Sequence, residues 1–314
     1  MSKFAAVFPG QGSQSIGMLA SLAQTYPVVG ETFQEASDVL STDLWALAQE
    51  GPEAQLNATV NTQPVMLAAG VAVWRAWNAA GGCGPAVMAG HSLGEYTALV
   101  CADALKFADA VALVVERARQ MQAAVPEGTG AMAAILGLDD DKVIEVCEQA
   151  AQGRVAAAVN FNSPGQVVIA GHAEAIERAV ALAKDAGAKR AIKLPVSVPS
   201  HCELMRPAAE GMAVQLEATE LHTPATPVVH NVDVVSHDEP DAIRQALVGQ
   251  LHQPVRWVET VQSFKAQGID QLIEFGPGKV LAGLTRRIDR SLSGQCVMDE
   301  GSLEKALSVC SGDE

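Results

Sequence analysis

The stretch Gly90-His91-Ser92-Leu93-Gly94 decides how this chain is interpreted. Residues 86–89 before it are all apolar and predict a short buried strand, and residues 95–101 after it predict the start of a helix. A serine between two glycines in a strand-turn-helix segment is typical of a nucleophile elbow, because the glycines permit a tight turn that raises the hydroxyl out of the sheet. The alternative is an ordinary Gly-rich turn before a helix.

A serine nucleophile needs a base, and His201 is the histidine that fits best. It follows the Pro-punctuated segment 195–200, a predicted loop between the apolar run 191–194 and a helix expected near Glu203. Catalytic groups often lie on such loops at the ends of rigid elements. His91 is expected to point away from Ser92. The remaining histidines are interpreted as solvated or structural: His172, His222, His230, His237 and His252.

Four signatures follow one another along the chain. They are residues 7–14 (VFPGQGSQ), 90–96 (GHSLGEY), 196–201 (VSVPSH) and 274–279 (EFGPGK). With these segments the chain resembles the malonyl-CoA:acyl carrier protein transacylases of bacterial fatty acid synthesis. The resemblance implies transfer of a malonyl group from coenzyme A to the phosphopantetheine thiol of acyl carrier protein through a malonyl-Ser92 intermediate. His201 accepts the serine proton and returns it to the leaving thiol. No cofactor is implied, because the coenzyme A thioester is a substrate.

The resemblance also supplies the group that orients His201. It is the backbone carbonyl of Gln250, where a serine triad normally has a carboxylate. The carboxylates of Asp233 and Glu203 remain alternatives on the sequence alone. If only the backbone of Gln250 is used, its substitution is expected to matter little.

Two backbone N–H groups are expected to form the oxyanion hole. Leu93 supplies one through the geometry of the elbow, and Gln11 matches the second donor of the family. Gln11 lies in the Gly-rich loop 9–12, after a strand expected over residues 4–8. Neither dinucleotide nor P-loop motif is present, which disfavours a nucleotide-binding interpretation of this loop.

Arg117 is the cation that the resemblance assigns to the free carboxylate of malonate. A guanidinium presents a planar fork to a carboxylate and stays charged at physiological pH. On its residues alone, the helix expected over 109–121 would make Arg117 a surface arginine, and Ala118 departs from the glycine common in the family. Gln63 falls in a family-like segment and is expected to line the same pocket. Asn160 and Asn162 could line it too, but are more typical of a turn.

Composition and cysteine usage bound the class of protein. With 314 residues, 49% hydrophobic, the chain suits a soluble globular protein, and no stretch approaches the roughly 20 apolar residues of a membrane helix. Its first residues do not resemble a signal peptide, so we expect a cytoplasmic protein. Scattered cysteines predict free thiols and no disulfide or metal site: Cys83, Cys101, Cys147, Cys202, Cys296 and Cys310. Cys202 as a competing nucleophile is disfavoured, since it should point away from its neighbour His201.

The net charge of −15 argues against nucleic acid as a partner. It also raises a difficulty, because acyl carrier proteins are generally acidic and would be repelled at long range. Two basic clusters are candidate docking sites, although solvated side chains are an equally good interpretation. The clusters are Lys189, Arg190 and Lys193, and Lys279, Arg286, Arg287 and Arg290.

The fold class expected is α/β, for which the resemblance implies a hydrolase-like parallel-sheet core with an inserted ferredoxin-like subdomain. Residues 131–194 carry a β-α-β-β-α-β pattern, which indicates the insertion. Predicted domain limits are 1–127 with 198–314 for the catalytic domain and 128–197 for the small subdomain. The chain after Asp299 is expected to be weakly ordered.

Two alternative functions stay open. One is a serine hydrolase or thioesterase, and the other is a silent domain that binds carrier protein. Arg117 favours the malonyl enzyme over the hydrolase or thioesterase.

Overall fold

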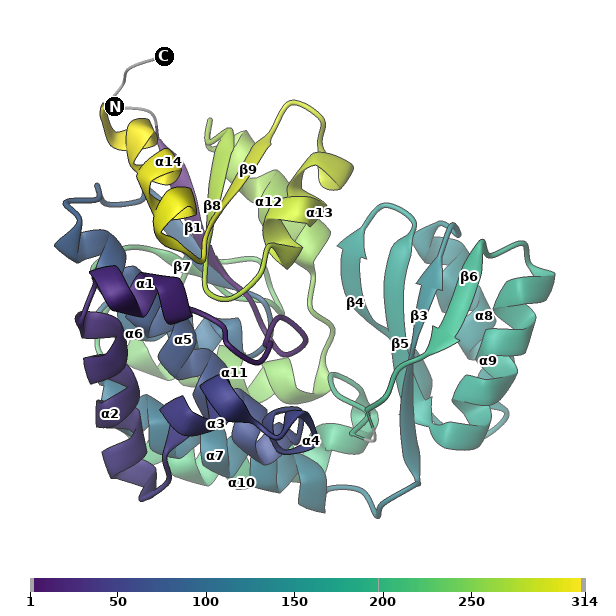
Figure 1. Cartoon of the computed structure of the whole chain (residues 1–314). Coiled ribbons are helices and arrows are strands. Elements are labelled where there is room, and N and C mark those ends of the chain that lie inside the picture. Colours follow the sequence, from purple (N-terminus) through teal and green to yellow (C-terminus); the bar gives the residue numbers. More distant parts are fainter. Residues whose placement is uncertain (1–2, 197, 312–314) are drawn as a thin grey trace.

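A five-stranded parallel sheet, with strand order β7-β2-β1-β8-β9, forms the centre of the larger of two lobes in the computed structural model, which describes residues 3–196 and 198–311 (Figure 1). Strand β1 lies in the middle with every residue buried. Its side chains alternate between two apolar clusters, Phe4 and Phe8 on one face and Ala5 and Val7 on the other. Burial on both faces explains why this strand is a continuous apolar run. The strands are β1 (Phe4–Phe8), β2 (Val87–Gly90), β7 (Val228–Val229), β8 (Gln271–Phe275) and β9 (Ser293–Val297).

Helices cover both faces of this sheet. One face carries the main apolar cluster, around the buried helix α5, and the other carries α12 and α13. The helical segments of the large lobe before β7 are α1 (Ala20–Thr25), α2 (Val28–Leu40), α3 (Leu44–Glu50), α4 (Glu53–Leu56), α5 (Thr59–Ala79), α6 (Gly94–Cys101), α7 (Phe107–Ala123), the 3₁₀ turn η1 (Glu203–Met205) and α10 (Arg206–Glu217). After β7 come α11 (Pro240–His252), α12 (Trp257–Ala266), α13 (Val280–Ile288) and α14 (Glu300–Ser311). No helix in the described ranges has both the length and the apolar character needed to span a bilayer.

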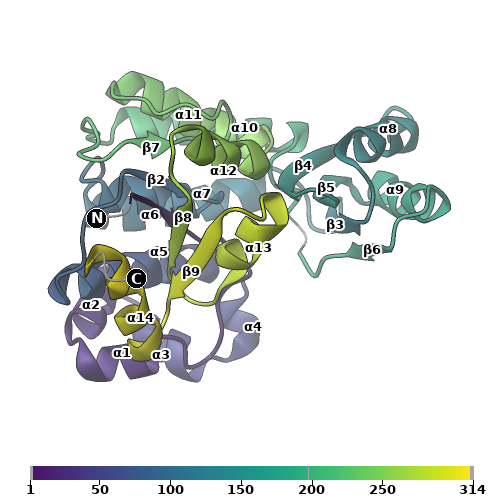
Figure 2. The same ribbon diagram turned by 90° about the horizontal axis from the view of Figure 1, so that it is seen from above.

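The smaller lobe is an antiparallel sheet with two helices on one side. Its elements are β3 (Gly130–Leu136), α8 (Asp140–Ala151), β4 (Ala156–Ser163), β5 (Gln166–His172), α9 (Ala173–Asp185) and β6 (Arg190–Lys193). The strand order β4-β5-β3-β6 is that of a ferredoxin-like unit. Figures 1 and 2 show α8 and α9 on the side away from the large lobe, so the open face of the sheet is turned toward it. The fold class predicted from the sequence is confirmed.

Backbone hydrogen bonds join the two lobes. The Phe161 N–H donates to the Val255 carbonyl (3.0 Å), and the Val255 N–H donates to the Val159 carbonyl (2.8 Å). The edge strand β4 is therefore tied to the segment between α11 and α12, which fixes the small lobe over one end of the parallel sheet. The domain limits at 127/128 and 197/198 stay predictions, and Ser197 itself lies outside the described residues.

The C-terminal segment differs from the sequence-based expectation. Residues 300–311 form the helix α14, whose Leu303, Ala306 and Val309 are buried in the main cluster. Cys310 forms a disulfide with Cys83, with the two Cα atoms 5.5 Å apart. The expectation of weak order was wrong because α14 has an apolar face that packs on the core. The prediction of free thiols was wrong for this pair, 227 positions apart, and holds for the other four cysteines.

The disulfide is expected to stabilise the fold, because it restricts the unfolded chain. Cys310→Ser should lower the free energy of unfolding by about 2–4 kcal/mol, measured by urea and thermal denaturation. Reductant should lower the melting temperature of the wild type and leave that of the variant unchanged. Equal melting temperatures for the two proteins without reductant would contradict this role.

Candidate active site

The turn between β2 and α6 holds Ser92 in an unusual backbone conformation. Its φ is 52°, a left-handed value that costs a non-glycine residue of order 1–3 kcal/mol. The flanking glycines are required by close backbone approach. A Cβ on Gly90 would lie 1.8 Å from the Gly94 carbonyl carbon, and one on Gly94 would lie 2.1 Å from the Phe8 oxygen. The strand-turn-helix segment therefore has the geometry of a nucleophile elbow.

His201 lies against the hydroxyl of Ser92. Its Nε2 is 2.8 Å from Ser92 Oγ, and its Nδ1–H donates to the Gln250 carbonyl over 2.6 Å. The bond to a carbonyl fixes the tautomer, so Nε2 carries the free lone pair and accepts from the serine. His201 has a φ of 65°, and its own N–H donates to the Leu251 carbonyl. This arrangement suits transfer of the serine proton to the imidazole.

Burial keeps His201 neutral. Desolvation is the largest cause that lowers the pKa of its imidazole, and the positive charge of Arg117 lowers it further, to about 3. The side chain is 3% exposed. At neutral pH the imidazole is therefore unprotonated and available as a base.

Arg117 is a fully buried cation beside the same hydroxyl. From helix α7 its guanidinium donates to Gln63 Oε1 (2.9 Å), Gln250 Oε1 (2.9 Å) and Ser92 Oγ (3.2 Å). It also lies 5.6 Å from the centre of the Tyr96 ring. Its Nε has no partner, and no carboxylate within the described part of the chain forms an ion pair with it. The charge of Glu95 favours the cation through space, but every hydrogen-bond partner of the guanidinium is neutral. A buried cation without a directly bonded anion is costly, and a bound carboxylate would complete its shell.

Gln250 contributes its side chain as well as its carbonyl. The amide oxygen accepts from Arg117, and Nε2 donates to the Ser92 carbonyl over 2.9 Å. Gln250 is near the end of α11 and fully buried. Substitution of Gln250 was expected to matter little only if its backbone alone was used. The side chain is used as well, because it joins Arg117 to the backbone of Ser92.

The two expected oxyanion donors lie together at the cavity. Leu93 immediately precedes α6, and Gln11 lies in the loop after β1. The backbone N–H of each has no acceptor in the described ranges, and both residues line the space in front of Ser92. Two unpaired N–H groups next to a nucleophile suit an oxyanion.

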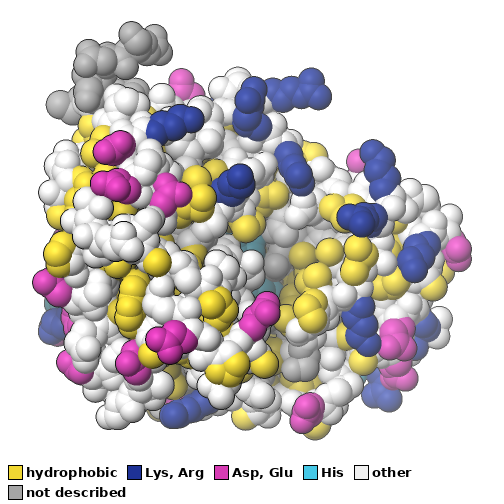
Figure 3. Space-filling view, in the orientation of Figure 1, with side chains coloured by type: hydrophobic (Ala, Val, Ile, Leu, Met, Phe, Trp, Pro, Cys, Tyr) yellow, Lys and Arg dark blue, Asp and Glu magenta, His cyan; other side chains and the backbone are white. Residues whose placement is uncertain are grey.

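A cavity of about 270 Å³ lies between the lobes in front of Ser92. The large lobe contributes the polar groups described above, and the small lobe adds apolar walls such as Met132, Val168 and Leu194. Figure 3 shows the hollow between the lobes, with histidine atoms at its floor. Asn160 and Asn162 line it from strand β4, not from a turn, and Asn162 Oδ1 is 2.9 Å from His91 Nε2.

Comparison with known proteins gives a consistent result. The acyl transferase domain family matches residues 6–298. The malonyl CoA-acyl carrier protein transacylase of Escherichia coli K12 is 58% identical over 309 residues, which are 98% of this chain and 100% of that protein. The chain belongs to the malonyl CoA-acyl carrier protein transacylase family. An acyl carrier protein S-malonyltransferase from Vibrio cholerae superposes with a TM-score of 0.95 at 58% identity, over 97% of this chain and 100% of that chain.

A second solved structure of this transacylase family carries a partner. It is described as a type II PKS acyl carrier protein in complex with its malonyl-transacylase. Its superposition has a TM-score of 0.97 at 59% identity, covering 98% of this chain and 99% of that chain.

The sequence left open two carboxylates as the group that orients His201 and one thiol as a competing nucleophile, and the structure decides between them. Asp233 pairs with His237 (2.7 Å) and Glu203 with Arg206, so neither carboxylate bonds to His201. The Cys202 thiol donates to the Pro199 carbonyl, and burial raises its pKa to about 12, which suppresses the thiolate.

Three buried residues behind the serine were not identified from the sequence as one group, and His230 was interpreted only as a solvated or structural histidine. Glu95, His230 and Asn231 have no exposed surface and are linked by hydrogen bonds. Glu95 resembles any acidic residue in a first helical turn, and the other two follow a two-residue strand that carries no periodic signal. Only their contacts in the tertiary structure identify these three residues as a group.

The neutrality of His201 can be observed directly. A group with a lowered pKa takes up its proton only at lower pH, so the Hε1 resonance of His201 should not titrate between pH 8 and pH 5. The resonance can be assigned by its absence in His201→Gln. An NMR midpoint near the ordinary value of about 6.5 would contradict the effect of burial.

Proposed function

We propose that this protein is a malonyl-CoA:acyl carrier protein S-malonyltransferase of fatty acid biosynthesis, with Ser92 as nucleophile and His201 as general base and acid. The observation that carries the proposal is the guanidinium of Arg117, which is buried beside Ser92 Oγ and forms no ion pair in the described chain. An acyl donor with a free carboxylate provides the missing anion. The names of the relatives, which specify malonyl CoA and acyl carrier protein, support the same donor and acceptor.

The first half-reaction acylates the serine. Ser92 Oγ attacks the thioester carbonyl while its proton passes to His201 Nε2, 2.8 Å away. The resulting oxyanion accepts hydrogen bonds from the N–H groups of Leu93 and Gln11. The C–S bond then breaks, the proton on Nε2 goes to the departing coenzyme A sulfur, and malonyl-Ser92 remains.

The second half-reaction runs the same steps with a different thiol. The phosphopantetheine thiol of the carrier protein gives its proton to His201 and attacks the ester carbonyl. When the tetrahedral intermediate collapses, Ser92 Oγ leaves and recovers the proton from Nε2. The Gln250 carbonyl, 2.6 Å from Nδ1, keeps the imidazole in one orientation through both halves.

Arg117 is the proposed discriminator between malonyl donors and neutral acyl groups. Its charge binds the free carboxylate, and Gln63 and Gln250 hold the guanidinium in place. A hydrolase acting on neutral esters would gain nothing from a buried cation at this point. A domain that only binds carrier protein would need neither the Ser92–His201 pair nor the unpaired N–H groups of Leu93 and Gln11 at the cavity.

Labelling with acyl-CoA tests both proposed roles. Intact-protein mass after brief incubation with malonyl-CoA should show one malonyl adduct on the wild type and none on Ser92→Ala. In Arg117→Ala, kcat/KM for malonyl transfer should fall at least about 100-fold, because a charge-assisted contact is lost, while acetyl-CoA becomes the relatively better donor.

Two other outcomes would overturn the proposal. Release of free coenzyme A by the wild type without an adduct would indicate hydrolysis. Neither adduct nor turnover would indicate a binding domain.

The two basic clusters defined above are the proposed docking surface for the carrier protein. Lys189, Arg190, Lys279, Arg286, Arg287 and Arg290 are exposed, and none forms an ion pair in the described ranges. Lys193 is instead bonded to Glu177. Figure 3 shows Lys and Arg side chains around the upper rim of the hollow on both lobes. Local positive charge there offsets the overall charge of −15 toward an acidic partner.

Charge reversal tests this surface. Lys189→Glu with Arg190→Glu, and separately Arg286→Glu with Arg287→Glu, should raise the KM for acyl carrier protein about tenfold at low salt, with a smaller effect as ionic strength rises. The matched control is Lys142→Glu with Arg154→Glu, which reverses two exposed, acid-paired charges elsewhere on the small lobe. An unchanged KM would remove the cluster concerned from the docking surface.

The proposed place of action is the cytoplasm. Coenzyme A thioesters and four free cysteines are consistent with a reducing compartment, whereas the Cys83–Cys310 disulfide is the feature that argues against it. Cell fractionation, with alkylation before lysis to count free thiols, tests the assignment.

A further inference from the structure

The left-handed backbone of Ser92 needs a structural restraint. Serine does not favour a φ of 52°, and such residues persist where their surroundings hold them. The glycines on either side permit the turn, but they do not select it. The groups that bond to the backbone from 90 to 92 therefore decide whether the hydroxyl reaches His201.

The side-chain amide of Asn231 spans this turn. Its Oδ1 accepts from the Ser92 N–H over 2.7 Å, and its Nδ2 donates to the Gly90 carbonyl, also over 2.7 Å. Both ends of the amide are used, which fixes its orientation. Because the Ser92 N–H is engaged here, it does not serve as an oxyanion donor, and that task is left to Leu93 and Gln11.

Glu95 holds Asn231 in turn. One carboxylate oxygen accepts from the Asn231 backbone N–H (2.9 Å), and the other accepts from His230 Nδ1 (2.7 Å). Glu95 lies in the first turn of α6, and its own N–H donates to the Ser92 carbonyl. The loop after β7 is thus fastened to the elbow by a carboxylate three residues beyond the serine. All three side chains are fully buried, where an unpaired polar group would be costly.

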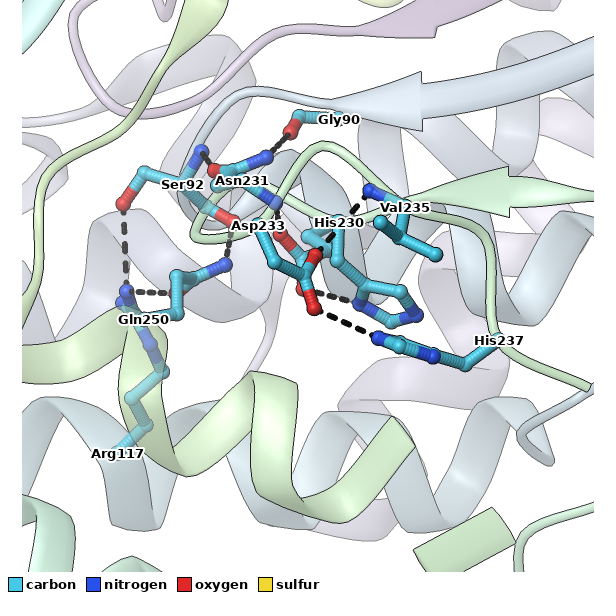
Figure 4. A network of polar contacts seen from close by, with 10 residues as sticks. Gly90, Ser92, Arg117, His230, Asn231, Asp233, Val235, His237 and Gln250 are labelled. Atoms are coloured by element: carbon cyan, nitrogen blue, oxygen red, sulfur yellow. Dashed lines mark hydrogen bonds and ion pairs between the residues drawn. The ribbon is translucent and has the colours of Figure 1, made fainter. Parts of the chain in front are cut away.

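The network lies behind the serine and outside the cavity. Glu95, His230 and Asn231 are absent from the cavity lining. Figure 4 shows the Ser92 hydroxyl directed toward Arg117, with Asn231 and His230 on the other side of the serine backbone. These residues consequently do not touch an acyl group held in front of Ser92.

We infer that Asn231 is a positioning residue for the nucleophile, and that Glu95 and His230 act through it. The amide holds the Ser92 backbone so that Oγ points at His201 Nε2. The Glu95–His230 pair holds the Asn231 amide in the position where it makes these bonds. Loss of the network lets the turn relax toward ordinary backbone angles and moves Oγ out of line. Displacements of about 1 Å can lower a rate on the order of 100-fold.

The inference rests on Ser92 being the nucleophile, and the experiment separates the two claims. Single-turnover acylation by malonyl-CoA is measured for the wild type, Ser92→Ala, Asn231→Leu and Asn231→Asp, with the melting temperature of each. Affinity for malonyl-CoA is measured in the Ser92→Ala background, with and without Asn231→Leu. His230→Asn, whose amide nitrogen matches the position of Nδ1 and can still donate to Glu95, is compared with His230→Leu, which cannot.

A positioning role predicts a split between rate and binding. Asn231→Leu should lose about 10- to 100-fold in acylation rate, with malonyl-CoA affinity within about twofold of its parent. Asn231→Asp keeps the acceptor for the Ser92 N–H but loses the donor to Gly90, so its rate should fall between. His230→Asn should retain most of the rate that His230→Leu loses.

A buried polar control distinguishes this role from general destabilisation. Ser37→Ala removes a buried hydroxyl that donates to the Phe33 carbonyl within α2 and accepts from the Leu44 N–H, and these residues belong to neither the cavity lining nor the network. It should lower the melting temperature without changing the acylation rate of the folded protein. Wild-type acylation by folded Asn231→Leu, or by folded Asn231→Asp if the first does not fold, overturns the inference. Labelling of Ser92→Ala overturns the proposed nucleophile instead.

Discussion

The hydrogen bond between Ser92 Oγ and His201 Nε2 is the contact on which the site depends, and it joins residues 109 positions apart. Ser92 reaches it from the end of a central strand of the parallel sheet, and His201 from the segment that returns from the small lobe. Both residues have positive φ, so neither hydroxyl nor imidazole is placed by relaxed backbone geometry. Tertiary packing has to hold both turns, which explains why so many of the groups behind them are buried and paired.

Arg117 imposes the second constraint. A guanidinium with 2% exposure cannot give up its proton, so its charge must be balanced or the fold is destabilised. Two glutamine side chains and the face of Tyr96 provide partial compensation without cancelling the charge. Burial is the main cause that lowers the pKa of His201, and the positive charge of Arg117 lowers it further. The buried cation thereby accounts for the proposed choice of donor and contributes to the neutral state of the proposed base.

Division into two lobes gives the site its walls. The large lobe carries the proposed nucleophile, the proposed base and the buried cation, while the open face of the small sheet closes the cavity with apolar side chains. Backbone pairing of β4 with Val255 fixes the lobes across this cavity.

The sequence alone determined the fold class and the positions of its signature residues. Apolar runs and Gly-rich turns specify β1, β2 and the elbow because buried parallel strands and tight turns leave local patterns. Resemblance to a family singled out Arg117, which local pattern alone would have placed on the surface. Tertiary structure decided the rest: the double use of Gln250, the network of Glu95, His230 and Asn231, and the ordered helix α14 with its disulfide. These features arise where distant segments meet, and contacts between residues more than a hundred positions apart leave no periodic trace in the chain.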